Sequence, residues 1–398
     1  HGSLHRGLNL SEIVNDRVNI GYALLQLGNC SLEEVNMDSA HFYLIKALTV
    51  FKDSTNSEML AKVYRNLSAL YGQRSQRDSQ QVYLDRSIAI RRLLPDKHPL
   101  VDALLLQAKN KLGAGNVTAA KALLSESEEI IKRFPGAVEN QHDVQHLRAL
   151  TLFHEGRFDE AMTLVDSARN YYFKTSLLRK YVTLLIDLGK IFSDRGEYEL
   201  ALNNLYDGLR ITRLQGFEAE TYIIRKRIGW VNFSLGDPNQ ALRLANESLQ
   251  SEKKKILVND LANALTLKGV VLTDLNEFGQ AKFCLDSAYQ IYKRMGNAEK
   301  TSEALLNLGA LEAKLNHTPQ ALHLYSQSIE LAKSVSYTYG LAWSNWATGD
   351  IYFRQGNYQK AELFLNESEK YCRLIQANEI QILNYNTRRD LLAAQGLY

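Results

Sequence analysis

The chain has 398 residues, of which 45% are hydrophobic and 23% charged, and its formal net charge is +3. This is the composition of a folded protein, and the charge is too small to indicate a nucleic acid or another polyanion as the partner. The longest apolar runs, such as 103–106, are far shorter than the roughly 18 residues that a membrane span needs. Membrane insertion of this chain is therefore not expected.

The cysteines and prolines narrow the organisation further. Cys30, Cys284 and Cys372 are odd in number and have no C-x-x-C spacing, so neither a disulfide framework nor a zinc site is predicted. The compartment stays open between a periplasmic or other extracytoplasmic location and the cytoplasm. Only five prolines occur and no Pro-, Gly- or Ser-rich linker interrupts the chain, which favours one continuous array over several separate domains.

Residues 1–13 precede the regular part of the chain. The first three residues, His1-Gly2-Ser3, resemble the remnant of an expression tag and are left out of the fold reasoning. We interpret 1–13 as this remnant followed by a lead-in segment.

Two ladders of small residues follow, each with a step of forty residues. A fixed step of this length indicates one structural unit copied along the chain. Each copy reads as an apolar segment containing a small residue, a Gly-x-aromatic break, and a second segment that begins with alanine, which predicts a helix-turn-helix unit. The ladders consist of Ala161, Ala201, Ala241, Ala281, Ala321 and Ala361, and of Gly189, Gly229, Gly269, Gly309 and Gly349.

The copy at 181–194 shows why such a unit folds. Leu185, Leu188 and Phe192 recur at three- and four-residue steps and share one helical face. Gly189 lies in the same segment, where glycine costs about 1 kcal/mol, so its recurrence predicts close approach of the neighbouring helix. Gly196 can take the left-handed conformation that ends the helix, and Asn276 substitutes for glycine in the corresponding turn of another copy. One such unit is too small to fold alone, so we expect the units to stack.

The predicted fold class is therefore all-α, an α-α superhelix of about nine helix-turn-helix repeats plus a terminal helix. The array is expected over 14–376, and the first repeat is expected to carry an insertion near 29–39, between Gly28 and Ala40. Residues 377–398 are expected to form a tenth first helix or a capping helix; because the turn residues Gly396 and Tyr398 are retained, truncation of a longer array is favoured. The small-residue position is assigned to Gly21, Ser68, Ala108, Ala149, Gly189, Gly229, Gly269, Gly309 and Gly349.

At this point the chain resembles the tetratricopeptide repeat family. The matching residues of one copy are Leu188-Gly189, Phe192, Gly196, Tyr198, Ala201 and Leu205. The family's usual period is 34, so a step of forty implies that each helix pair is longer by about a turn and a half. The phrases at 305–309 and 356–361 are similar to the long arrays of bacterial sensor histidine kinases and helix-turn-helix regulators.

The resemblance implies that a ligand lies along a concave groove lined by the first helices. All three tryptophans fall among the implied groove positions, and aromatic anchors are typical of binding surfaces; burial against neighbouring helices is the alternative for them. Lys226, Asn263 and Asn307 loosely resemble the family's grip on a peptide carboxylate. The implied ligand-binding residues are Lys190, Lys226, Trp230, Phe233, Asn263, Thr266, Asn307, Trp343, Trp346, Asp350 and Phe353.

No catalytic motif occurs in the sequence, so no enzyme, cofactor or metal site is predicted. His142, His146 and His154 follow one another along one helical face and could offer metal ligands, but solvated side chains on an exposed helix are the favoured interpretation. The basic runs 225–227 and 253–255 lie near aromatic residues, as in proteins that bind single-stranded nucleic acid. Successive helical positions point in different directions, so nucleic-acid binding is not favoured.

The leading functional hypothesis is a non-enzymatic scaffold that binds a protein or peptide in its concave groove. It would form the sensor or interaction region of a larger bacterial signalling protein, a histidine kinase or transcriptional regulator, with an output domain attached after Tyr398. The alternative is a free-standing peptide-pheromone receptor or adaptor. An RNA-binding solenoid is a distant third.

Overall fold

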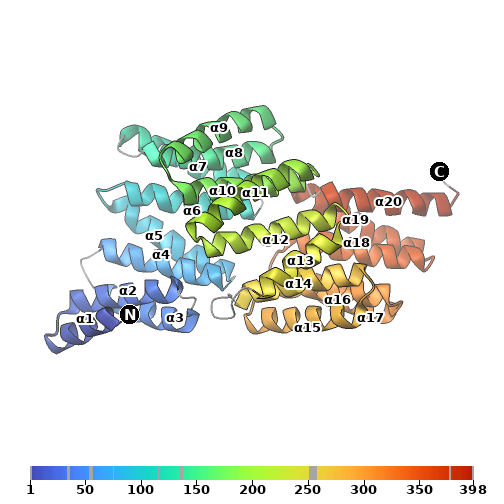
Figure 1. Ribbon diagram of the computed structural model, residues 1–398, viewed down its shortest axis with the longest axis horizontal. Helices are drawn as coiled ribbons and strands as arrows, with labels where there is room; N and C mark the ends of the chain where they lie inside the picture. Colours follow the sequence, from blue (N-terminus) through green and yellow to red (C-terminus); the bar gives the residue numbers. More distant parts are fainter. Residues whose placement is uncertain are drawn as a thin grey trace. The chain divides into compact units, whose positions relative to one another are not determined.

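The structure is a computed structural model that describes residues 2–33, 36–52, 57–74, 76–114, 116–134, 138–250, 258–375 and 378–396. Within these ranges the chain forms twenty α-helices and no β-strand (Figure 1). Most helices are 17 residues long, for example α4, α10 and α16. The prediction of an all-α fold is confirmed.

The chain divides into two compact units, one ending at Leu177 and the other beginning at Leu178. Unit 1 contains α1 (Gly2–Ile13), α2 (Arg17–Glu33), α3 (Met37–Phe51), α4 (Ser57–Gln73), α5 (Arg77–Leu93), α6 (His98–Gly113), α7 (Val117–Arg133), α8 (Val138–His154) and α9 (Phe158–Lys174). Unit 2 contains α10 (Leu178–Asp194), α11 (Tyr198–Gln215), α12 (Glu218–Ser234), α13 (Pro238–Gln250), α14 (Val258–Asp274), α15 (Phe278–Arg294), α16 (Ala298–Lys314), α17 (Thr318–Ser334), α18 (Thr338–Arg354), α19 (Tyr358–Ile375) and α20 (Asn378–Ala394).

The division between the units falls within the array of repeats that the sequence predicts. It falls at residues 175–177, a turn of the same length as the turn at 195–197 inside unit 2. Because no Pro-, Gly- or Ser-rich linker marks the boundary, composition alone does not reveal it.

Where the structure describes them in full, the turns inside the helix pairs are closed by a residue with positive φ. Gly196 has φ 79°, and the next backbone N–H, that of Glu197, donates to the carbonyl of Phe192 at 2.8 Å. Asn276 has φ 63°, and the N–H of Glu277 donates in the same way to Leu272. Asparagine tolerates this conformation better than most residues other than glycine, so the predicted exchange of Gly for Asn at this turn is confirmed.

The glycine ladder marks a close approach of the two helices in a pair at four of its five positions; Gly229 instead meets Leu267 of the next first helix, α14. A Cβ atom added to Gly189 would lie 2.6 Å from Leu205 Cδ2, and one added to Gly309 would lie 2.4 Å from Tyr325 Cε1. Cβ atoms do not tolerate such distances, so the glycine allows a large side chain of the second helix to rest on the backbone of the first. The prediction of close packing at this position is confirmed.

The predicted register of the first repeat is wrong. A Cβ atom on Gly28, not on Gly21, meets the equivalent residue of the second helix, Leu44, at 2.7 Å, with the same sixteen-residue spacing as Gly189 and Leu205. Helix α2 is 17 residues long, like its counterparts, and α3 begins at Met37, so no insertion near 29–39 is needed; residues 34 and 35 lie outside the described residues. A Cβ atom added to Gly21 would also lie 2.7 Å from side-chain atoms of Phe51 and Val50, so α2 approaches α3 closely at this glycine too.

Both ends of the described chain are helical. Residues 1–13, interpreted as a tag remnant and lead-in, include α1, whose Leu8 is buried in the core of unit 1. Helix α20 stands in the place of a tenth first helix, and Arg389 occupies the position that Gly349 holds in α18. Gly396 has φ 68°, while Leu397 and Tyr398, the rest of the predicted turn, lie outside the described residues.

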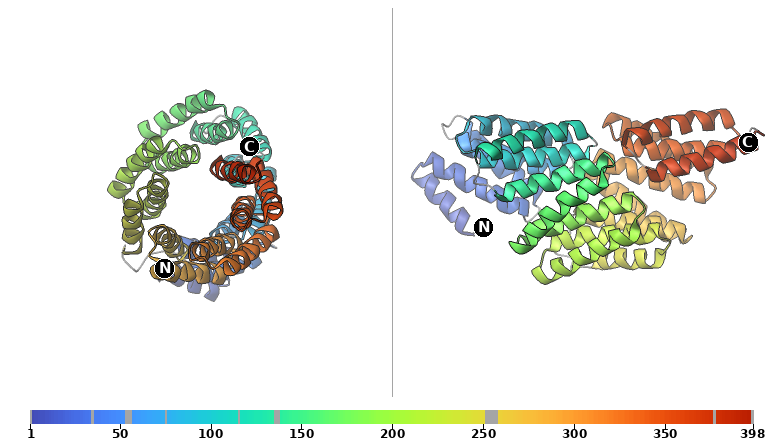
Figure 2. Two further views of the ribbon diagram at one scale, coloured as in Figure 1. Left: turned by 90° about the vertical axis from the view of Figure 1, so that its right-hand side faces the viewer. Right: turned by 90° about the horizontal axis from the view of Figure 1, so that it is seen from above.

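In unit 2 the first helices form the inner layer (Figure 2). Helices α10, α12, α14, α16, α18 and α20 pack on one another in succession, in addition to packing on their neighbours in the chain. Within the described residues the second helices α11, α13, α15, α17 and α19 have no comparable packing on one another. Helices that approach each other more closely line the inside of a curved stack, so the first helices of unit 2 carry its inner face, as predicted.

Candidate functional site

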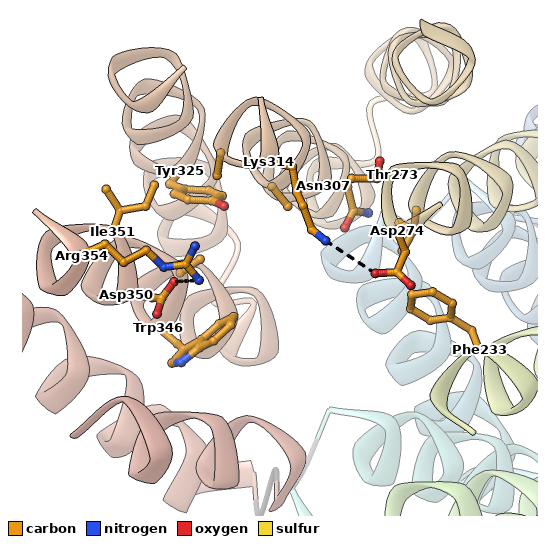
Figure 3. A pocket seen from close by; sticks show the side chains of 14 residues that line it. Phe233, Thr273, Asp274, Asn307, Lys314, Tyr325, Trp346, Asp350, Ile351 and Arg354 are labelled. Carbon is orange, nitrogen blue, oxygen red and sulfur yellow. Dashed lines mark ion pairs between the residues drawn. The ribbon is translucent and has the colours of Figure 1, made fainter. Parts of the chain in front are cut away.

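The inner layer of unit 2 contains a pocket of about 300 Å³. Its side chains come from the first helices α12, α14, α16 and α18 and from one second helix, α17. Figure 3 shows Trp346 and Phe233 on opposite sides of it, each beside an ion pair. The pocket is lined by Phe233, Val270, Thr273, Asp274, Asn307, Ala310, Ala313, Lys314, Tyr325, Trp346, Ala347, Asp350, Ile351 and Arg354.

The two ion pairs lie at the edge of the pocket. Lys314 Nζ is 3.7 Å from Asp274 Oδ1, and each side chain is about half exposed. Arg354 Nη2 is 2.8 Å from Asp350 Oδ2 one helical turn earlier. Between them the lining is mostly apolar, since alanines contribute much of the wall. A few polar groups around an apolar surface are typical of sites that bind small ligands.

Four of the eleven residues implied by the resemblance line this pocket: Phe233, Asn307, Trp346 and Asp350. Asn307 offers an amide donor and an amide acceptor at the surface of α16. Trp346 lies against Trp343 with ring centroids 5.4 Å apart in an edge-to-face arrangement. The Trp346 Nε1–H donates to Thr387 Oγ1 at 3.2 Å, which holds the indole in place at the pocket wall.

The other aromatic residues of the set pack mainly within the repeats. Trp230 contacts Phe233 edge to face at 6.1 Å and packs against the core of α13 and α14. Trp343 packs against a small core formed by α18, α19 and α20, and Phe353 packs against the core of α19 and α20. The three tryptophans are thus all partly buried, and Trp346 is the one that also lines the pocket.

Two polar residues of the set are buried and engaged inside the fold. Asn263 Oδ1 accepts a hydrogen bond from the Tyr292 hydroxyl at 3.0 Å. Thr266 Oγ1 donates to the carbonyl of Ala262 at 2.9 Å. Tyr292 comes from the second helix α15, so this bond depends on packing between helices and could not be read from the pattern of α14.

A polar cluster on the first helices α12, α14 and α16 lies outside the pocket lining. Burial, with the nearby charges of Lys300 and Arg227, lowers the pKa of Lys226 to about 8. Burial also raises the pKa of Asp260 to about 6, although the charge of Lys226 and a hydrogen bond from Asn263 oppose this rise. The predicted carboxylate grip is not assembled at the pocket, because Asn307 lines it whereas Lys226 and Asn263 belong to this cluster.

Lys190, the remaining residue of the set, is exposed on α10. Lys190 does not line the pocket in the described part of the chain.

Sequence reasoning missed Tyr325. It belongs to the second helix α17, whereas the resemblance implies a groove lined by first-helix residues. Tyr325 follows the ladder glycine Gly309 by sixteen residues. Three other repeats of unit 2 have leucine at the equivalent position, namely Leu205, Leu285 and Leu365. This departure from the repeat pattern is the signal that could have identified it.

Alternative sites receive no support from the described residues. His142 stacks on Tyr171 with centroids 3.9 Å apart, and no group of three or more His, Cys, Asp or Glu side chains in the described ranges could hold a metal ion. The basic run 253–255 lies outside the described residues. No helix in the described part of the chain is both long and apolar enough to cross a membrane.

Comparison with known proteins indicates the class of protein. A tetratricopeptide repeat model matches residues 260–334, and a search of curated proteins gave no significant match. The fold and the ladder of close contacts define an α-solenoid built of helix pairs. Residues 260–334 are therefore a tetratricopeptide repeat segment, and the predicted superhelical fold class is confirmed.

Three solved structures show the same fold. A Rap protein complexed with competence and sporulation factor has 15% identity and a TM-score of 0.61, with 93% of this chain and 99% of that chain covered. The Rap conjugation gene regulator of plasmid pLS20 in complex with the Phr* peptide has 13% identity and a TM-score of 0.57, with 90% and 96% covered. The apo quorum sensor NprR from B. thuringiensis has 15% identity and a TM-score of 0.53, with 94% and 99% covered.

Proposed function

We propose that this protein is a receptor that binds a short extended peptide on the inner face of unit 2. Of the two main hypotheses from the sequence, the peptide receptor is better supported than a sensor region attached to a histidine kinase. Two of the similar folds were solved with competence and sporulation factor and with the Phr* peptide. The proposed role requires binding alone, without chemistry on the ligand.

The observation that carries the proposal is the pocket between Phe233 and Trp346. Its volume of about 300 Å³ lies at the lower end of the range of about 300–1,000 Å³ for small-ligand sites, which suits one or two side chains of a peptide. Aromatic residues supply contact area with little loss of conformational entropy. The Asn307 amide can donate to a peptide carbonyl and accept from a peptide N–H at once. These features together fit a peptide whose backbone crosses α16 and whose side chain enters the pocket.

A display library of random decapeptides, selected on the full chain, tests the proposal. A selected peptide is then synthesised, and its affinity is measured by calorimetry for the wild type and for Trp346→Ala and Asn307→Ala. We expect Trp346→Ala to weaken binding by about 30-fold, as truncation of a central aromatic anchor does, and Asn307→Ala by about 10-fold.

The matched control is Tyr206→Ala, which removes an aromatic side chain that is 43% exposed on the second helix α11. Its affinity for the peptide should equal that of the wild type. Retained helicity, measured by circular dichroism, shows that each variant is folded. Failure to enrich any peptide, or equal losses in Trp346→Ala and Tyr206→Ala, would overturn the proposal.

A further inference from the structure

The carboxylate of Asp350 is the most buried charge of the two ion pairs at the pocket. Its side chain is 19% exposed, whereas its partner Arg354 is 72% exposed. Burial raises the pKa of Asp350 even though the charge and hydrogen bond of Arg354 oppose this rise. Burial therefore destabilises the charged form of Asp350 by more than Arg354 stabilises it. An additional positive charge at the pocket would stabilise this carboxylate.

The ion pair with Arg354 is also easily exchanged. Arg354 is the exposed member of the pair, so water competes for its guanidinium and a long side chain must be held in place for little gain in stability. The Arg354 side chain can turn to solvent without leaving a buried guanidinium behind. The Asp350 carboxylate is then available to a cation that enters the pocket.

The Tyr325 hydroxyl adds a second oxygen at the same place. The side chain is only 3% exposed, and its oxygen is turned toward the space between the two ion pairs (Figure 3). No hydrogen bond to this hydroxyl occurs among the described residues. Burial, followed by the negative charge of Asp350, raises the pKa of Tyr325, which places the phenol within electrostatic range of the carboxylate. A ligand group that meets both oxygens must be a hydrogen-bond donor.

The wall of the pocket suits an aliphatic chain. Ala310, Ala313 and Ala347 leave room where larger side chains would fill the space, and Trp346 offers an aromatic face on which a cation can rest. A purely apolar side chain would cover the Asp350 carboxylate further without compensating its charge, which is costly. An acidic side chain would add repulsion.

Resting on the proposed peptide-receptor function, we propose that this pocket is the subsite for a lysine or arginine side chain of the peptide. The aliphatic stem lies along the three alanines, and the cationic head binds the Asp350 carboxylate and the Tyr325 oxygen. Asp350 and Tyr325 then determine specificity for a basic residue at one position of the ligand.

A double-mutant cycle on the selected peptide tests this subsite. The protein change is Asp350→Asn, which keeps the shape of the side chain and removes its charge. The peptide change is the basic residue to norleucine, which keeps the stem and removes the head. We expect each single change to weaken binding about tenfold or more, and the two together to weaken it no further than either alone. Asp207→Asn, at a 51%-exposed carboxylate that pairs with Arg210 on the second helix α11 and does not line the pocket, is the matched control and should change affinity less than threefold.

Tyr325→Phe removes only the hydroxyl and gives a second readout. It should weaken binding of the basic peptide about fivefold and leave binding of the norleucine peptide unchanged. The subsite is wrong if selected peptides bind in a manner sensitive to Trp346→Ala but carry no recurring basic residue, or if Asp350→Asn and Asp207→Asn have equal effects. In those outcomes the receptor function stands. If no peptide binds, the receptor function and the subsite both fail.

Discussion

Adding one methyl group to Gly309 tests whether the glycine ladder is a packing requirement. The new Cβ would lie 2.4 Å and 2.6 Å from two ring carbons of Tyr325, a buried side chain that cannot move without shifting α17. Overpacking of this kind costs about 1–3 kcal/mol, while replacing glycine by alanine in a helix returns about 1 kcal/mol. The expected net change for Gly309→Ala is a loss of up to about 2 kcal/mol in the free energy of unfolding.

The control is Gly279→Ala in α15, where no atom lies within 4 Å of the added Cβ; this variant should gain up to about 1 kcal/mol. Gly349→Ala, whose nearest contact is Leu365 Cγ at 3.0 Å, should fall between the two. Urea unfolding followed by circular dichroism measures all three against the wild type. If Gly309→Ala unfolds at the same urea concentration as Gly279→Ala, close helix approach does not explain the ladder.

Three further outcomes are expected. Because burial raises the pKa of Asp260 from 3.8 to about 6, the folded protein binds this proton more tightly, so this group lowers the free energy of unfolding as pH rises from 3.8 to about 6. Urea midpoints across that range should show that Asp260→Asn removes this fall. Lys226 has the opposite effect on the free energy of unfolding. Because burial lowers its pKa from 10.5 to about 8, this group raises the free energy of unfolding as pH rises from about 8 to 10.5. Lys226→Met should abolish that rise in the same assay. Burial raises the pKa of the Cys284 and Cys372 thiols, so a thiol reagent should label partly exposed Cys30 first and the other two only in denaturant; equal rates in the native protein would contradict their burial.

Much of the fold could be predicted because it rests on local chemistry. The forty-residue step, the positive φ at Asn276 and the small residue at Gly189 each follow from a few neighbouring side chains. The register of the first repeat could not be settled in this way, because Gly21 and Gly28 both lie in α2 and both make close contacts with α3. Only the position of Leu44 across the helix pair identifies Gly28 as the ladder residue.

The site was harder to predict than the fold because it depends on contributions from several helices. The pattern of first helices placed Phe233, Asn307 and Trp346 on the inner face, and the structure brings them to one pocket. The same pattern assigned Asn263 to the groove, although a hydroxyl from another helix engages it inside the fold. Tyr325 was missed because a second-helix side chain reaches the inner face only where a glycine lets it approach the first helix.

The packing of the first helices on one another has a mechanical consequence for unit 2. Since adjacent pairs touch on the inside, a small rotation between two pairs turns about that inner line of contact, and the helices farther out sweep through a longer arc. A molecule bound between Phe233 of α12 and Trp346 of α18 would act close to this inner line of contact, so a small movement there would shift the outer helices further. Binding of the proposed peptide there would displace α13, α15 and α17, and a partner protein that senses the peptide would then contact the outer surface.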